Sequence, residues 1–165
     1  PGGEHHGTLQ LNEGTVNVKN GKVTAGNFIM DMTSIVDKDL EDPKMNKKLV
    51  THLKSEDFFS VDKFPEASFE ITDIKPLSNA QEASNGVTPT HKVSGNLTVK
   101  DNTNNLTFNA KVEVKNNMLE AHSARFIIDR TKWDVNYKSK SIFDNLKDKF
   151  IHDDVALEVV LHAKK

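Results

Sequence analysis

Apolar residues stand at every second position over most of the chain, which is the pattern of β-strands with one buried face. The alternating runs cover residues 7–35, 67–74, 91–100, 106–115, 118–129 and 155–163. Between such runs, Asn20-Gly21 and Asn116-Asn117 are typical of tight hairpin turns, and residues 101–105 are predicted to form another turn. The pattern therefore predicts an antiparallel meander.

Glycines interrupt one predicted strand, whereas another keeps a regular two-residue phase. Gly14 and Gly26 interrupt the alternation of the first run, and a glycine inside a strand often marks a turn or a β-bulge. In the run 67–74, Phe69, Ile71 and Asp73 fall in the same phase, so we expect them to share one face. A bulge at Gly14 or Gly26 would help the sheet to curve, as a barrel requires.

Residues 43–56 form the one segment with a convincing helical period. Asp42 is a suitable N-cap, Pro43 suits the first helical position, and apolar residues recur at every fourth position from Met45. Because the apolar stripe is narrow and the other face is rich in lysine, we expect this short helix to lie across the barrel.

These elements predict an all-β fold, an antiparallel β-barrel of about eight strands, with a two-sheet sandwich as the alternative. The chain has 165 residues, which suits a single domain over residues 1–165. A net charge of -2 gives no reason to expect a nucleic acid partner. The absence of long apolar runs predicts no membrane span, and the absence of cysteine excludes disulfides and thiolate metal sites.

Few residues suggest catalysis or metal binding. His5 and His6 are adjacent, and adjacent strand residues point to opposite faces, so we do not expect both to bind one ion. Asp129, Arg130 and Asp134 are expected to form an arginine–carboxylate brace around a turn instead of an acid–base site. We therefore predict neither catalytic nor metal-binding residues, and no enzyme.

A barrel of this size either fills its interior with side chains or holds a small ligand. The alternation alone does not separate these two outcomes. The aromatic and methionine side chains expected inside would suit an adaptable apolar pocket.

Several segments together resemble the YceI-like family: GEHHG at 3–7, FIMDMTSI at 28–35, HLKSEDFF at 52–59, FPEASFEI at 64–71 and FIIDRTKWDVNY at 126–137, followed by DDVALEVVLHA at 153–163. The resemblance implies a lipocalin-like barrel that binds a polyisoprenoid, an isoprenoid quinone or a fatty-acid-like lipid. It implies a periplasmic, cell-envelope or secreted bacterial protein with no cofactor other than a bound isoprenoid or acyl lipid. It also implies that the first family strand lies upstream of residue 1.

The resemblance gives architectural roles to Phe58, Phe59 and Pro65 around the end of the helix, and to Arg130 and Trp133 in the DRT-x-W element. Strand parity supplies the expected apolar channel, with two further residues, Trp133 and Phe143, at one end. The channel residues are Phe28, Met30, Met32, Phe69, Ile71, Leu97, Val99, Phe108, Phe126, Ile128, Trp133, Phe143 and Leu161.

The predicted function is therefore the non-enzymatic binding, transport or storage of a long-chain lipid inside the barrel. The alternative is a structural or interaction domain of the cell envelope whose core is filled. The sequence leaves a homodimer open.

Overall fold

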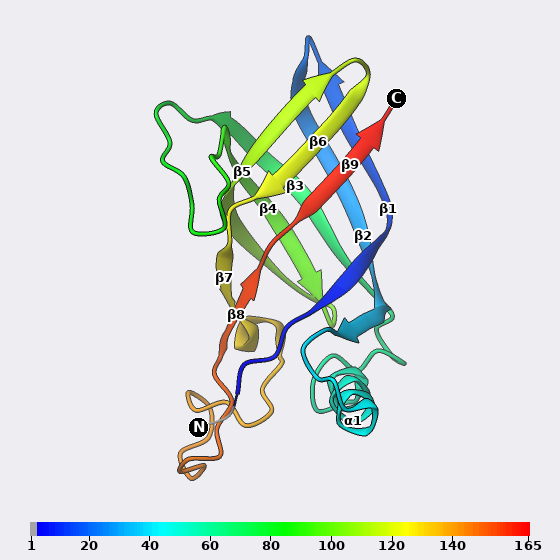
Figure 1. Cartoon of the computed structure of the whole chain (residues 1–165), viewed down its shortest axis with the longest axis vertical. Helices are drawn as coiled ribbons and strands as arrows, with labels where there is room; N and C mark the ends of the chain where they lie inside the picture. Colours follow the sequence, from blue (N-terminus) through cyan, green and yellow to red (C-terminus); the bar gives the residue numbers. More distant parts are fainter. Residues whose placement is uncertain (1–2) are drawn as a thin grey trace.

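The computed structural model describes residues 3–165 and shows an antiparallel barrel wall with one helix at one end (Figure 1). Seven strands form the main sheet in the order β1-β2-β3-β4-β5-β6-β9, and β7 pairs with β8. The strands are β1 (Gly7–Lys19), β2 (Lys22–Asp37), β3 (Glu66–Pro76), β4 (His91–Val99), β5 (Asn102–Lys115), β6 (Met118–Ser123), β7 (Phe126–Asp129), β8 (Asp154–Leu157) and β9 (Val160–Lys164). The predicted all-β barrel is confirmed, and it is nearly closed, with β1 and β9 at the edges of the main sheet.

The runs 118–129 and 155–163 were each predicted as one strand, and each is divided in two. Their register changes by one residue, from His122 opposite Val160 to Phe126 opposite Leu157. At the break, the Ser123 hydroxyl accepts a hydrogen bond from the Val159 backbone N–H at 2.8 Å. The Ser123 hydroxyl takes the place of a backbone carbonyl as the acceptor. The register therefore changes there while the Val159 N–H keeps a hydrogen-bond partner.

The hairpin turns at Asn20-Gly21 and Asn116-Asn117 are confirmed, and all four residues have positive φ angles. The turn predicted over 101–105 is too long. Only Lys100 and Asp101 form it, with φ angles of 51° and 59°. Asn102 already begins β5, because such a two-residue turn matches the twist of the strands it joins.

The irregularities of the strands lie elsewhere than predicted. The register of β1 and β2 shifts near Thr8, Leu11 and Asn17, and not at Gly14 or Gly26. In β3 the register shifts between Ile71 and Asp73, so the expectation that Asp73 shares the face of Phe69 and Ile71 is wrong. Ile74 is half-buried in its place, while Asp73 is exposed.

The predicted helix is present as α1 (Pro43–Lys54). As expected, Asp42 is the N-cap, and its side chain accepts hydrogen bonds from the backbone N–H groups of Lys44 and Met45 at 2.8 and 3.0 Å. The helix covers one end of the barrel, where Leu53 packs against a buried cluster. The cluster consists of Met32, Ile35, Val61 and Ala67.

Within residues 3–165, no helix has the length and apolar character needed to cross a lipid bilayer.

Candidate functional site

Four phenylalanines on four different strands form a continuous aromatic row along one face of the wall. The ring centroids of Phe28 and Phe69 are 6.5 Å apart, and those of Phe69 and Phe108 are 5.8 Å apart. Phe108 and Phe126 stack at 4.6 Å with an interplanar angle of 11°. The aromatic row, as we call these four residues, therefore crosses the wall from β2 to β7.

Glycines make room for these rings. Gly95 lies on β4 between Phe69 and Phe108, and a Cβ atom there would overlap the Phe69 ring. A Cβ on Gly14 would stand 2.7 Å from the Phe28 ring, and one on Gly26 would stand 3.1 Å from the same ring. Each of the three glycines thus lets a ring lie close against the backbone of a strand. The bulges predicted at Gly14 and Gly26 are wrong, and both glycines make room for the Phe28 ring instead.

The aromatic row lies on the inner face of the barrel. On β4, Val93 and Leu97 share the phase of Gly95 and are only 5% and 8% exposed, while Lys92 in the opposite phase is exposed. The same division holds on β5, where Phe108 is half-buried and Asn109 is exposed. All four rings of the row remain half-buried, so part of each ring is accessible on an otherwise apolar wall.

The total accessible surface is larger than a compact monomer of this mass exposes. It amounts to 11327 Å² for a chain of 18.5 kDa. A compact monomer of this mass is expected to expose about 8,000 Å². The edge strand β1, exposed along nearly its whole length, is one clear source of this excess.

The other predicted channel residues divide between this wall and the helix end. Ile71, Ile128 and Leu161 are half-buried like the aromatic row. Met30 and Val99 pack instead against the buried cluster that includes Met32, beneath α1. Leu97 and Trp133 are buried. Phe143 lies apart from all of them, 47% exposed on the irregular segment 138–151.

Trp133 belongs to η1, a 3-10 helix (Arg130–Trp133), and its indole N–H donates a 2.8 Å hydrogen bond to the Leu97 carbonyl. Trp133 is 3% exposed, so its ring is part of the closed end of the barrel. The Asp129 carboxylate accepts hydrogen bonds from the backbone and the hydroxyl of Thr131 and caps η1.

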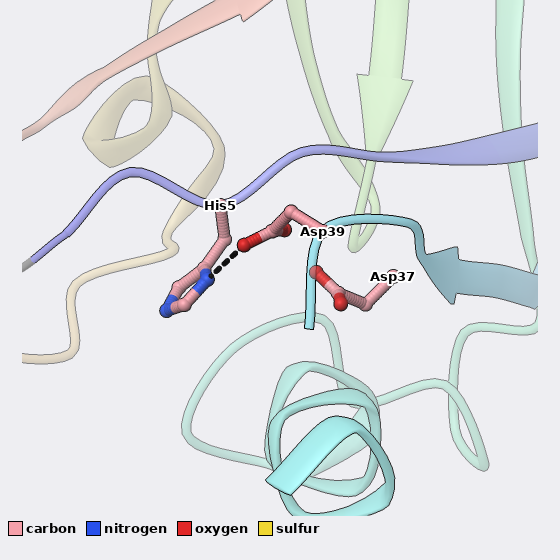
Figure 2. A group of neighbouring side chains, drawn as sticks. All are labelled: His5, Asp37 and Asp39. Carbon is pink, nitrogen blue, oxygen red and sulfur yellow. Dashed lines mark hydrogen bonds and ion pairs between the residues drawn. The ribbon is translucent and has the colours of Figure 1, made fainter. Parts of the chain in front are cut away.

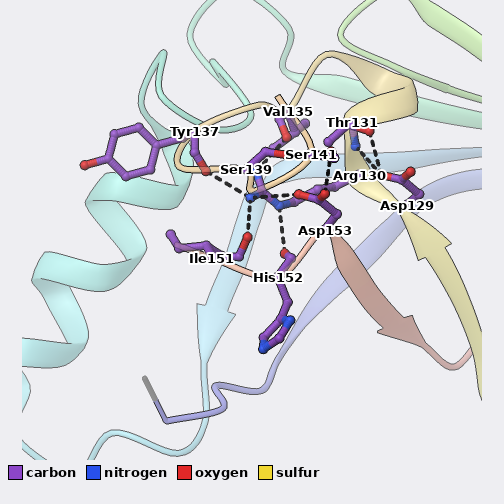
Figure 3. A network of polar contacts seen from close by, with 10 residues as sticks. All are labelled: Asp129, Arg130, Thr131, Val135, Tyr137, Ser139, Ser141, Ile151, His152 and Asp153. Atoms are coloured by element: carbon purple, nitrogen blue, oxygen red, sulfur yellow. Dashed lines mark hydrogen bonds and ion pairs between the residues drawn. The ribbon is translucent and has the colours of Figure 1, made fainter. Parts of the chain in front are cut away.

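Arg130 holds the irregular segment that follows η1, as Figure 3 shows. Arg130 as a whole residue is only 4% exposed. It donates hydrogen bonds of 2.6 to 3.1 Å to four backbone carbonyls, those of Val135, Tyr137, Ile151 and His152. Arg130 thus braces the turn as predicted, but the predicted partners are wrong: Asp129 caps η1 and Asp134 accepts from the Asn136 side chain, while backbone carbonyls are the main acceptors of Arg130.

The carboxylate of this brace is Asp153, whose Oδ1 lies 3.6 Å from the guanidinium. Burial lowers the pKa of Arg130, while Asp153 and Asp129 oppose this shift. Burial alone would raise the pKa of Asp153, but hydrogen bonds with Ser139 and Ser141 and the charge of Arg130 outweigh it and lower that pKa. Both groups are therefore charged at neutral pH, and they act as a structural pair.

The residues 52–69, which join the end of α1 to β3, contribute mainly to the helix end of the barrel. Phe58 is buried and packs against His52 and Tyr137, with ring centroids 5.0 and 5.3 Å away. His52 also contacts Asp57 at 2.8 Å and so fixes the turn after α1. Of the phenylalanines in this stretch, Phe69 is the member of the aromatic row.

Sequence reasoning missed two features of the inner wall and the end. The role of Gly95 depends on a ring from β3, and Tyr137 meets α1 only through the tertiary fold. A glycine in phase with the inward residues of β4 was the one available signal for the first feature.

A match to known proteins covers almost the whole chain: the model of the YceI-like domain matches residues 2–163. No curated protein sequence matches the chain.

Solved structures of low identity share the fold. The YceI protein of Campylobacter jejuni is 14% identical, with a TM-score of 0.65 and coverage of 96% of this chain and 84% of that chain. BcnA of Burkholderia cenocepacia is 19% identical, with a TM-score of 0.67 and coverage of 92% and 83%. A polyisoprenoid binding domain from Saccharophagus degradans, implicated in plant cell wall breakdown, is 9% identical, with a TM-score of 0.58 and coverage of 94% and 84%.

Proposed function

Because the chain belongs to the YceI-like domain family, we propose that it binds a long-chain amphiphilic lipid inside the barrel and carries or stores it without catalysis. The observation that carries this proposal is the aromatic row, four half-buried phenylalanines seated on glycines along the inner wall. A structural relative is described as a polyisoprenoid binding domain, which supports the same ligand class.

The ligand class follows from the lining. The inner wall offers rings and aliphatic groups, so it favours an isoprenoid, an isoprenoid quinone or an acyl chain. Burial of one CH₂ group contributes about 0.8 kcal/mol, so a tail of about fifteen carbons contributes roughly 12 kcal/mol before entropy is subtracted. Tight binding therefore requires no catalytic group. We place this function in the periplasm or cell envelope, where members of the family commonly act.

Lipid extraction tests the proposal directly. Protein purified without detergent is extracted with organic solvent, and the extract is analysed by mass spectrometry. We expect one lipid class at a stoichiometry near one per chain. If the extract is free of lipid and the protein also fails to bind added quinones and fatty acids, the alternative of a structural domain with a filled core is correct.

Phe108→Ala distinguishes lipid binding from a filled core, because Phe108 is central in the aromatic row. We expect at least a tenfold weaker Kd for the lipid, about 1.4 kcal/mol, with an unchanged far-UV spectrum. A filled core would instead lose about 3 to 5 kcal/mol of stability, with no ligand to release. Asn109→Ala is the matched control, since this exposed neighbour points away from the inner wall.

A further inference from the structure

Three side chains that can bind a metal ion meet near α1 at the helix end of the barrel (Figure 2). They are His5, from the segment before β1, and Asp37 and Asp39, from the end of β2 and the connection to α1. One ligand atom from each lies within 4.8 Å of the other two. His5 Nδ1 and Asp39 Oδ2 are 2.9 Å apart.

Surrounding groups hold these carboxylates in place, as is usual around a metal site. Asp37 is buried, and its Oδ2 accepts hydrogen bonds from the Leu40 backbone N–H at 2.8 Å and from the Asn46 side-chain amide at 3.2 Å. The Oδ1 atom of Asp39 accepts from the His6 backbone N–H at 2.8 Å. The orientation of both carboxylates is thus set by groups that would remain outside the coordination sphere.

The cluster is suited to a cation. It combines two carboxylates with one imidazole, and their ligand atoms lie close enough together to bind one ion. Two carboxylate groups in this proximity repel each other when both are ionised, and a bound cation relieves that repulsion. The exposed residues Glu4 and Glu41 add further negative charge in the adjoining segments.

We propose that His5, Asp37 and Asp39 bind a divalent transition metal ion, with Zn²⁺ as the ion that this ligand set favours. One imidazole and two carboxylates suit zinc, whereas Mg²⁺ and Ca²⁺ prefer oxygen ligands alone. Three protein ligands leave a position for water. The ion joins the segment before β1 to the β2–α1 connection, where the Lys38 backbone N–H already donates to the His6 carbonyl at 2.9 Å.

This site differs from the one that the adjacent histidines suggest. The argument that His5 and His6 cannot both bind one ion from a regular strand still holds, because His6 contributes only its backbone here. The other ligands of His5 come from residues 32 and 34 positions further along the chain. The fold brings them together, so no sequence spacing marks the site.

The test uses the full chain without a histidine tag, treated with a chelator and then dialysed. Titration with Zn²⁺ alone at neutral pH, followed by calorimetry and by thermal unfolding, is expected to show one site with a Kd on the order of 10 μM or tighter. The same additions are expected to raise Tm, because the ion binds the folded state. Mg²⁺ is expected to bind at least tenfold more weakly.

Three variants assign the ligands. His5→Ala and Asp39→Asn are expected to weaken Zn²⁺ binding at least tenfold and to abolish the zinc-dependent rise in Tm. His6→Ala is the matched control and is expected to bind like the parent, because it keeps its backbone N–H. A cooperative melt of each variant without metal shows that it is folded.

The proposal is overturned if the parent chain shows no saturable zinc binding up to about ten times the expected Kd. It is also overturned if His6→Ala loses as much affinity as His5→Ala, or if Asp39→Asn binds as the parent does. In those cases His5 and Asp39 form an ion pair only.

Discussion

The helix end and the aromatic row are built from similar apolar side chains, yet they differ in how completely those side chains are covered. At the helix end, Met32 and Trp133 are 4% and 3% exposed, because α1, η1 and the segments beside them form a second layer. In the aromatic row, Phe69 and Phe108 contact other rings and glycines of the same wall and stay half-buried. The comparison shows that side chains at the helix end are fully covered by a second layer, whereas the rings of the aromatic row stay partly accessible.

The largest effect is expected for Arg130→Ala. The substitution leaves four backbone carbonyls without their donor and the Asp153 carboxylate without its partner. We expect a loss of about 3 to 5 kcal/mol in the free energy of unfolding, measured by urea denaturation. Arg125→Ala is the control, since Arg125 is exposed and its ion pair with Glu158 has a distance of 3.7 Å. Equal losses in the two variants would contradict a structural role for the brace.

Met32→Ala tests the helix end with an apolar residue. Its side chain is buried in the cluster beneath α1, so we expect a loss of about 2 to 4 kcal/mol. The lipid affinity of the folded fraction is expected to change less than twofold. Phe69→Ala is the reciprocal variant, with a smaller loss of stability and a larger loss of affinity. If Met32→Ala weakens lipid binding more than Phe69→Ala does, the ligand extends into the helix end.

Gly95→Val tests the contribution of the aromatic row. The new side chain would displace the Phe69 ring, interrupt the aromatic row and also press against the Glu70 backbone carbonyl of β3. We expect a loss of about 1 to 3 kcal/mol from this overpacking, together with weaker lipid binding. Lys92→Val on the exposed face of β4 is the control. Unchanged lipid binding in a folded Gly95→Val protein would show that the row is not the binding surface.

The smallest effect concerns the charges beside the helix end. Because hydrogen bonds with the His5 side chain and from the His6 backbone hold the pKa of Asp39 below its ordinary value in the folded chain, its ionised form stabilises the fold at pH values above about 4. This contribution is lost as the pH falls from there through the folded pKa. Thermal unfolding between neutral and acid pH is therefore expected to show a weaker pH dependence in Asp39→Asn. An identical dependence in both proteins would mean that Asp39 does not contribute.

Local features of the fold could be predicted from the sequence, because they depend on neighbouring residues. The alternation, the turns at Asn20-Gly21 and Asn116-Asn117 and the cap at Asp42 are of this kind, and all were found. Features that depend on remote residues could not be predicted. The break at Ser123 requires the backbone of Val159 as a partner, and nothing in a strand pattern marks a serine for that role.

The candidate site shows the same limit. Alternation placed Phe28, Phe69 and Phe108 in phase with the inward residues of their strands. It could not separate them from Met32, because the difference lies in what covers each side chain. The acceptors of Arg130 could not be predicted either, since backbone carbonyls of an irregular segment have no signature in the sequence. An arginine after a strand indicates a brace, and the fold decides which groups it holds.

The β1–β2 hairpin also bears on how fast the proposed ligand would enter and leave. β2 pairs with β3 from Asn27 to Asp31, and towards the turn at Asn20-Gly21 its ladder partner is β1 (Figure 1). A two-stranded ribbon is marginally stable by itself, so this tip should open locally far more often than the whole protein unfolds. Its amide hydrogens should exchange faster than those of β4, which is paired on both sides. Such opening would part the wall beside Phe28 and let a long chain pass sideways at a rate independent of global unfolding.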